Sequence, residues 1–171
     1  IMQLNGQSEA AIPLIEMIPP GGAVNYFRNI YLAKAYAAAG RYGDAAGTLL
    51  AIPANTIALS RQSVEDAARL LRSAPAKAGT PGTMPALGVF GFAYAYAGAP
   101  NRLMAAPERL LEIGEPSFFP AWVIWEPLNA PLRKTERFKA FARKAGLVEY
   151  WRARGWPDLC KPMGADDFVC D

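Results

Sequence analysis

The stretch "YLAKAYAAAGRYGDAAGTLLAIP", residues Tyr31–Pro53, has the pattern of two short amphipathic helices separated by Gly40. Leu32 and Tyr36 lie one helical turn apart in the first half, and the second half repeats that spacing of large residues. Glycine suits the break because it accepts the left-handed backbone conformation that often ends a helix. The alanines allow two helices to approach closely, so the stretch predicts a helical hairpin.

An internal repeat supports the hairpin. The segment "GQSEAAIPLIEMIP" (Gly6–Pro19) aligns with "GRYGDAAGTLLAIP" (Gly40–Pro53) at an offset of 34 positions. A period of 34 residues is that of the tetratricopeptide repeat, a helical pair that buries its apolar face only by stacking on its neighbours. The sequence begins inside such a unit, so we expect it to be part of a longer protein. The matched pairs are Gly6 with Gly40, Ala11 with Ala45, Ile15 with Leu49, Ile18 with Ile52, and Pro19 with Pro53.

A third unit is predicted over Pro85–Gly114, where Tyr94 and Gly98 take the places of Tyr36 and Gly40. The preceding Ser63–Ala74 is predicted to be a helix with Ser63 as its N-cap. We interpret that helix as a spacer or a decayed repeat. Its apolar stripe consists of Val64, Ala67, Ala68 and Leu71.

The longest uncharged run, Ala78–Asn101, raises the possibility of a membrane span. Its first third is rich in glycine and proline, and the remainder is shorter than the roughly 20 apolar residues that a span needs. The run therefore predicts a buried helix and no membrane span. The N-terminus lacks the pattern of a signal peptide.

The composition predicts a folded, non-enzymatic protein. Of its 171 residues 52% are hydrophobic and 19% charged, which favours a packed core over disorder. Histidine is absent, which removes the commonest general base and a common metal ligand. The glycine-rich segments match neither a phosphate-binding loop nor a dinucleotide fingerprint. We expect no catalytic residues, no metal and no cofactor.

The C-terminal part is aromatic and basic, and it holds half of the 18 lysines and arginines. Thr135–Ala145 is predicted to be an amphipathic helix with Phe138 and Phe141 on its apolar face. Basic side chains beside aromatic ones are also typical of nucleic-acid binding. We favour a solvated helix face and an aromatic cap on the repeat array, and expect no nucleic-acid contact, because both phenylalanines require the helix to be docked.

The segment "LRKTERFKAFARKAGLVEYWRARGWPDLC" resembles the closing segment of tetratricopeptide regions in bacterial signalling proteins. Those proteins carry winged-helix DNA-binding domains or class III nucleotide cyclases at their N-terminal ends. The resemblance implies an interaction or sensor region. It implies neither DNA binding nor cyclase activity, because the matching residues do not belong to those domains. It rests on Leu132, Arg133, Arg137, Phe138, Gly146, Leu147, Tyr150, Trp151, Gly155, Trp156, Pro157 and Cys160.

Cys160 and Cys170 flank a short segment containing Pro162 and Gly164, which suits a disulfide that closes a surface loop. Free structural thiols are the alternative, and zinc would need further ligands that histidine does not supply here. A disulfide would favour an extracytoplasmic location, and free thiols a cytoplasmic one. The adjacent Asp166 and Asp167 are interpreted as solvated and not as a catalytic or metal-binding pair.

A concave surface formed by the first helix of each pair is the predicted binding site for a protein segment. The alternative is that three units are too few for an open groove and that the tail fills it. A second alternative is a small-molecule pocket near Trp122 and Trp125. The predicted concave residues are Phe27, Ile30, Lys34, Ala37, Ala38, Gly88, Phe92, Ala95 and Tyr96.

The sequence thus predicts an all-α protein whose antiparallel helical hairpins stack in a right-handed superhelix. The repeat array is expected over residues 1–130, and a capping helix with an irregular tail over residues 131–171. The expected function is that of a non-catalytic interaction or sensor module in a bacterial signalling protein. Its expected partner is a protein or peptide segment, or an N-terminal effector domain.

Overall fold

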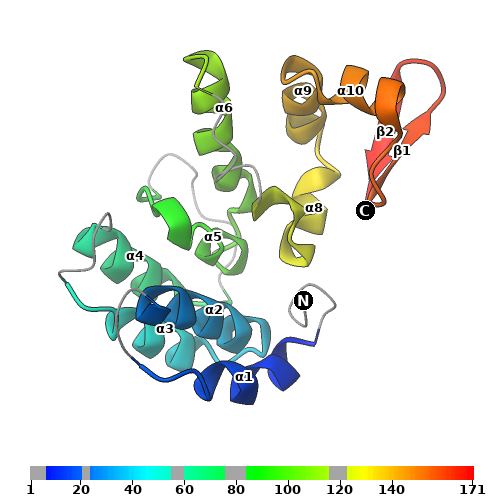
Figure 1. Cartoon of the computed structure of the whole chain (residues 1–171). Coiled ribbons are helices and arrows are strands. Elements are labelled where there is room, and N and C mark those ends of the chain that lie inside the picture. Colours follow the sequence, from blue (N-terminus) through cyan, green and yellow to red (C-terminus); the bar gives the residue numbers. More distant parts are fainter. Residues whose placement is uncertain (1–6, 21–23, 55–59, 76–83, 116–122) are drawn as a thin grey trace. The chain divides into compact units, whose positions relative to one another are not determined.

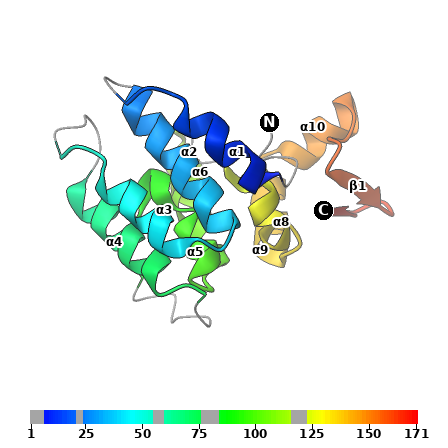
Figure 2. The same cartoon turned by 90° about the horizontal axis from the view of Figure 1, so that it is seen from below.

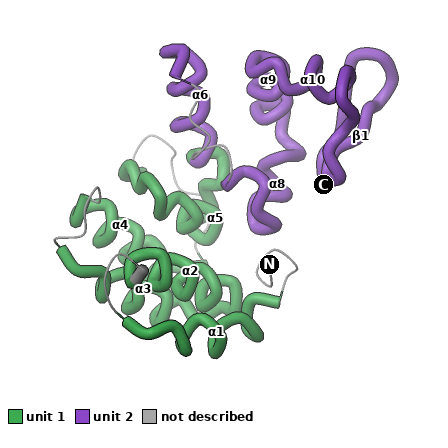
Figure 3. The backbone as a smooth tube through the Cα atoms, viewed as in Figure 1, with its two compact units in different colours: residues 1–102 green, residues 103–171 purple. Residues whose placement is uncertain are grey.

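The computed structural model describes residues 7–20, 24–54, 60–75, 84–115 and 123–171, and these residues are mostly helical (Figure 1). The chain forms two compact units, residues 1–102 and residues 103–171 (Figure 3). The predicted change from repeat array to capping segment at residue 130 falls inside the second unit. Each unit is described by itself below.

The first unit begins with four helices in which each packs against the next (Figures 1 and 2). The first and third have the same length, nine residues, and their bounds lie 34 positions apart. The period found in the sequence is therefore also the period of the helices. The four helices are α1 (Ser8–Glu16), α2 (Val24–Ala38), α3 (Tyr42–Leu50) and α4 (Arg61–Arg72).

Gly40 ends α2 as predicted. Its φ is +75°, and the N–H of Arg41 donates to the carbonyl oxygen of Tyr36 at 2.8 Å. The same arrangement recurs at Gly98, where φ is +69° and the N–H of residue 99 donates to the carbonyl oxygen of Tyr94 at 2.9 Å. Each of these two hydrogen bonds closes the end of a helix that terminates at a glycine. Gly40 and Gly98, which the sequence analysis aligned, therefore also share their backbone geometry.

Ser60, and not Ser63, is the N-cap of α4, which corrects the predicted start of this helix. The Ser60 hydroxyl oxygen accepts a hydrogen bond from the N–H of Ser63 at 3.4 Å. Ser63 lies inside the helix, where its hydroxyl donates to the carbonyl oxygen of Ala86 at 3.1 Å. The predicted apolar stripe of α4 is buried throughout.

α4 follows α3 in the way that α2 follows α1. In both cases an arginine near the start of the following helix, α2 or α4, donates to main-chain oxygens at the end of the preceding helix and two residues beyond it. The two sets of acceptors are again 34 positions apart, whereas the two arginines themselves are 33 positions apart. Arg28 binds the oxygens of Ile18 at 2.7 Å and Glu16 at 3.3 Å, and Arg61 binds those of Ile52 at 3.1 Å and Leu50 at 3.4 Å.

The buried helix predicted for the apolar part of Ala78–Asn101 is present only as short pieces. This segment forms two short 3-10 turns, η2 (Gly88–Phe90) and η3 (Pro100–Met104), on either side of the one-turn helix α5 (Ala93–Tyr96). Gly88 has a φ of +54°, a left-handed conformation that interrupts a helix. The run is nevertheless largely buried, since Phe90 and Phe92 are almost fully covered.

The described second unit contains three helices of eight or nine residues, α6, α9 and α10, with shorter helical pieces between α6 and α9. α9 begins after Thr135, whose hydroxyl accepts from the N–H of Phe138 at 3.2 Å, and Gly146 with a φ of +71° separates it from α10. Phe138 and Ala142 of the predicted apolar face are fully buried, and Phe141 is partly buried. The elements are α6 (Ala105–Glu112), η4 (Val123–Trp125), η5 (Pro127–Asn129), α8 (Ala130–Arg133), α9 (Glu136–Lys144) and α10 (Leu147–Arg154).

The all-α prediction holds for most of the described residues, but the tail that was expected to be irregular contains a small β-hairpin. β1 (Cys160–Met163) and β2 (Asp167–Cys170) pair antiparallel, with Cys160 opposite Cys170. Gly164 has a φ of +66° in the connecting turn, where glycine adopts that conformation without strain. Phe168 on β2 is fully buried.

Within the described residues, no helix is both long and apolar enough to cross a bilayer.

Candidate interaction surfaces

The described residues offer three candidate sites: the predicted concave set, an apolar edge on α1 and α2, and the charged and aromatic interior of the second unit.

The predicted concave residues differ in how far their side chains are buried. Ile30, Ala37 and Phe92 are buried, so their side chains contribute to packing and not to an open surface. The others retain exposure to different degrees. Lys34, Ala95 and Tyr96 are partly buried, whereas Phe27, Ala38 and Gly88 are exposed.

Side chains from α2 and α3 meet side chains from the α5 region within this set. The Lys34 ammonium lies 5.7 Å from the ring centre of Phe92 and 5.7 Å from that of Tyr31, distances that suit cation–π attraction. Tyr42 and Tyr96 make an edge-to-face contact with ring centres 5.6 Å apart. The first unit therefore brings Lys34, Phe92 and Tyr96 into internal contacts, which leaves less of the predicted set free to bind.

A second group of exposed apolar side chains lies near the end of α1 and at the start of α2. Leu14, Met17, Ile18 and Phe27 are 52%, 78%, 39% and 49% exposed, and we call these four residues the apolar edge. They belong to α1, the turn after it, and the first turns of α2. Sequence reasoning found only Phe27. The missed signal was the spacing of Leu14, Met17 and Ile18, a second helical stripe beside the buried one.

The apolar edge is held in place by polar contacts between α1 and α2. The Tyr36 hydroxyl donates to the Glu16 carboxylate, and this hydrogen bond is the main cause of the raised pKa of Tyr36. The Arg41 guanidinium lies over the Tyr36 ring at 4.4 Å. Together with the hydrogen bonds from Arg28 to the end of α1, these contacts fix the orientation of α1 on α2.

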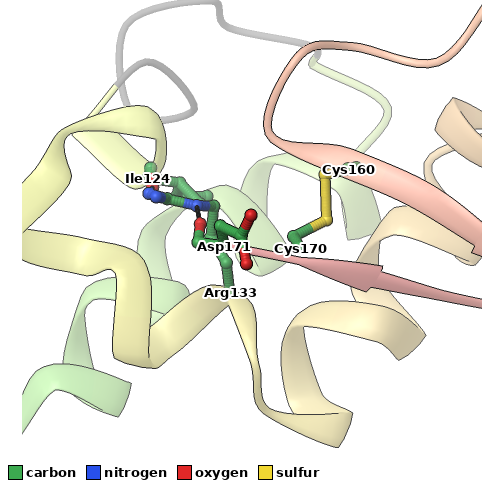
Figure 4. The surroundings of a disulfide bond; sticks show 5 residues. All are labelled: Ile124, Arg133, Cys160, Cys170 and Asp171. Atoms are coloured by element: carbon green, nitrogen blue, oxygen red, sulfur yellow. Dashed lines mark hydrogen bonds between the residues drawn. A yellow bond between two sulfur atoms is a disulfide. The ribbon is translucent and has the colours of Figure 1, made fainter.

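Arg133 is the most buried cation described in the second unit, with 2% of its surface exposed (Figure 4). Its Nε donates to a main-chain oxygen of Asp171 at 2.6 Å, and its Nη1 donates to those of Ile124 at 2.7 Å and Glu126 at 3.0 Å. Burial lowers the pKa of the guanidinium, against the charge of Asp171, which raises it. The group joins three segments and presents no free face to a substrate.

Of the adjacent Asp166 and Asp167, Asp167 makes ion pairs. Asp167 accepts from Lys139 at 2.8 Å and from Arg143 at 2.8 Å. The hydrogen bond from Lys139 is the largest cause of the lowered pKa of Asp167, and it also raises the pKa of Lys139. A carboxylate with a lowered pKa stays ionised near neutral pH, so Asp167 is a poor general acid.

Five aromatic rings form the interior of the second unit. They meet mostly edge to face, at centre separations between 5.5 and 6.3 Å, a geometry that aromatic pairs favour. Trp125, one of the residues of the predicted small-molecule pocket, is in contact with two of these rings, and Trp122 lies outside the described residues. The aromatic cluster consists of Trp125, Phe138, Trp151, Trp156 and Phe168.

Cys160 and Cys170 form a disulfide between opposed positions of the hairpin (Figure 4). Their Cα atoms are 4.1 Å apart, and both side chains are buried. With both thiols in this bond, neither offers a thiolate as nucleophile or metal ligand. In the part of the chain that the structure describes, no group of three or more acidic or cysteine side chains is arranged to hold a metal ion.

Comparisons of the chain with protein-family models, with curated proteins and with solved structures give no match.

Proposed function

We propose that this chain is a non-catalytic, tetratricopeptide-like interaction or sensor module of a bacterial signalling protein, and that it binds a protein segment. The observation that carries the proposal is the repetition of α1 as α3 at the 34-residue period, together with an arginine that binds equivalent main-chain oxygens at the end of each. Stacked helical pairs of this period serve widely as binding scaffolds. A right-handed superhelical stacking of the pairs is part of the proposal.

The exposed apolar surface supports a binding role. Most large apolar side chains of the described first unit are covered, yet four of them stay exposed together at the apolar edge. Single exposed apolar residues are ordinary, whereas several on adjoining turns are typical of an interaction site. The partner surface is expected to be apolar at its centre and polar at its rim.

The charged groups of the second unit support a structural role for that unit. Arg133 binds main-chain oxygens, and Asp167 is shared by two cations of α9. Such groups hold segments together and leave little freedom for proton transfer or nucleophilic attack. The proposed partner is thus a protein segment, including an effector domain of the same signalling protein, and not a substrate.

The test is a peptide selection followed by measurements with purified components. The full chain is used to select binders from a displayed random-peptide library, and each selected peptide is synthesised and titrated calorimetrically into wild type and variants. Leu14→Glu changes the apolar edge, and Lys34→Glu changes the predicted concave surface. Ile113→Glu, at a position as exposed as Leu14, is the matched control in the other unit.

The proposal expects saturable one-to-one binding that one of the two surface variants weakens about tenfold while the control variant leaves it unchanged. Selection of no peptide would contradict it. Peptides whose binding is equally insensitive to both surface variants would contradict it as well.

A further inference from the structure

We propose that the β1–β2 hairpin is a redox-controlled element of the second unit. Docking of the hairpin on the helices shields the Cys160–Cys170 disulfide from thiols, and the disulfide in turn keeps the hairpin docked. A dithiol reductant therefore reaches the bond only after the hairpin has opened, and reduction then favours the open hairpin. This device is independent of the binding function proposed above.

The disulfide has little access to solvent. Cys160 is 5% exposed and Cys170 is 1% exposed, although the residues of the connecting turn are exposed. Thiol–disulfide exchange requires a thiolate to reach one of the two sulfurs. A thiol therefore attacks only when the hairpin opens locally, and the population of the open form sets the rate of reduction.

Cationic side chains hold the hairpin at both of its ends. The contacts near the turn come from α9 and α10, and the contact beside the disulfide comes from α8 (Figure 4). Opening the hairpin breaks these contacts, so they control access to the bond. The donors are Lys139 and Arg143, which each bind the Asp167 carboxylate at 2.8 Å, Arg152, which binds the main-chain oxygen of Ala165 at 2.6 Å, and Arg133, which binds that of Asp171 at 2.6 Å.

The hairpin also supplies one ring of the aromatic cluster. Phe168 on β2 is fully buried, and its ring centre lies 5.6 Å from that of Trp151 and 5.8 Å from that of Trp156. A two-stranded hairpin is marginally stable by itself in water, so this one depends on its docking and on the disulfide. Once the bond is reduced, the open hairpin becomes more populated, and opening removes Phe168 from both tryptophans.

Reduction proceeds in two exchanges. A thiolate of a dithiol attacks one cysteine sulfur, the sulfur–sulfur bond breaks, and the other cysteine leaves as a thiolate that takes up a proton. The second thiol of the reductant attacks the resulting mixed disulfide, which frees the remaining cysteine and leaves the reductant as a cyclic disulfide. Two electrons and two protons thus pass to the protein. Because docking and reduction are linked, each disfavours the other by the same factor.

The test follows reduction of the folded full chain by dithiothreitol. Free thiols are alkylated at timed points and counted by mass spectrometry, and the same chain unfolded in urea gives the rate of the unshielded bond. Two variants, Asp167→Asn and Lys139→Met, remove contacts that hold the hairpin. Their matched controls are Asp166→Asn and Lys144→Met, at nearby exposed residues of the same charge.

We expect the folded chain to be reduced at least about a hundredfold more slowly than the unfolded chain. Asp167→Asn and Lys139→Met should each accelerate reduction roughly fivefold, and the control variants should not. Low concentrations of urea should change the rate only slightly, because the local opening exposes little surface. After reduction, amide exchange within residues 160–170 should increase about a hundredfold, with no change within residues 24–38.

The inference is overturned if the folded and the unfolded chain are reduced at the same rate, or if both hairpin variants behave like their controls. It is also overturned if the rate rises with urea as steeply as global unfolding does, because the whole unit would then have to unfold before the bond is reached. Circular dichroism verifies that each variant is folded. Lys139→Met preserves the test if Asp167→Asn does not fold.

Discussion

At the scale of single residues, the chain uses its charged side chains to join segments. Arg28 and Arg61 close helix ends, Arg133 binds three main-chain oxygens, and Lys139 and Arg143 hold Asp167. The sequence showed where the basic residues are but not their partners. Pairing depends on which segments the fold brings together, and that information is not contained in local spacing.

Replacing Arg133 by methionine should lower the free energy of unfolding by about 3 kcal/mol, because main-chain oxygens would lose their donor inside the protein. The measurement is urea unfolding followed by tryptophan fluorescence. Arg154→Met, at an exposed position of α10, is the control and should change little. Equal stability of the Arg133 variant and wild type would show that the three hydrogen bonds do not support the fold.

The ion pairs of Asp167 should make stability depend on pH in acid. Its folded-state pKa is lowered, so its contribution is fully present above the ordinary aspartate value of about 3.9 and is lost as pH falls through the folded-state value. Asp167→Asn should therefore be less stable than wild type at neutral pH, and the two should converge in strong acid. Denaturant unfolding across this range tests the expectation, with the exposed Asp158→Asn as control. A constant difference at every pH would be inconsistent with it.

At the scale of helices and strands, amphipathic spacing and glycine positions predicted the helical regions well. The extent of α3, the burial of the stripe on α4 and the role of Gly40 follow from periods and propensities that act locally. The hairpin was missed, since its strands have only four residues each and depend on contacts of Phe168 with distant rings.

Two glycines of the helical hairpin formed by α2 and α3, Gly40 and Gly47, should respond to alanine in opposite directions. Gly40 has a φ of +75° and open space around it, so alanine should cost about 1–2 kcal/mol through backbone strain alone. Gly47 is exposed inside α3 with equally open space, and there alanine should stabilise by about 0.5–1 kcal/mol. Thermal unfolding of both variants measures the two effects. A shift in the same direction for both would contradict the assigned helix end.

The disulfide should stabilise the hairpin by restricting the unfolded chain. Replacing both Cys160 and Cys170 by alanine should lower the free energy of unfolding by about 3 kcal/mol in the loop-entropy description. Wild-type protein reduced under mild conditions should have nearly the stability of the double variant. The stability of the double variant should not change when reductant is added. If reductant changed the double variant as much as wild type, the effect would not belong to this bond.

At the scale of the whole molecule, the chain divides into two units with different kinds of interior. The first relies on alanines between close helices, and the second on the aromatic cluster, a disulfide and Arg133. Several tail residues that carry the resemblance to signalling proteins have packing roles, among them Phe138, Trp151 and Cys160. A sequence pattern of this kind therefore reports how the segment packs. It does not identify a partner, because the binding residues lie on surfaces that local patterns describe poorly.

The central claim is that the chain acts as a binding surface located on its helical repeats. Amide hydrogen exchange of the full chain, measured with and without a selected peptide, tests it most directly. The account predicts added protection within residues 8–20 and 24–38 and unchanged exchange within residues 123–171. Added protection confined to residues 123–171, or none anywhere at saturating peptide, would contradict it.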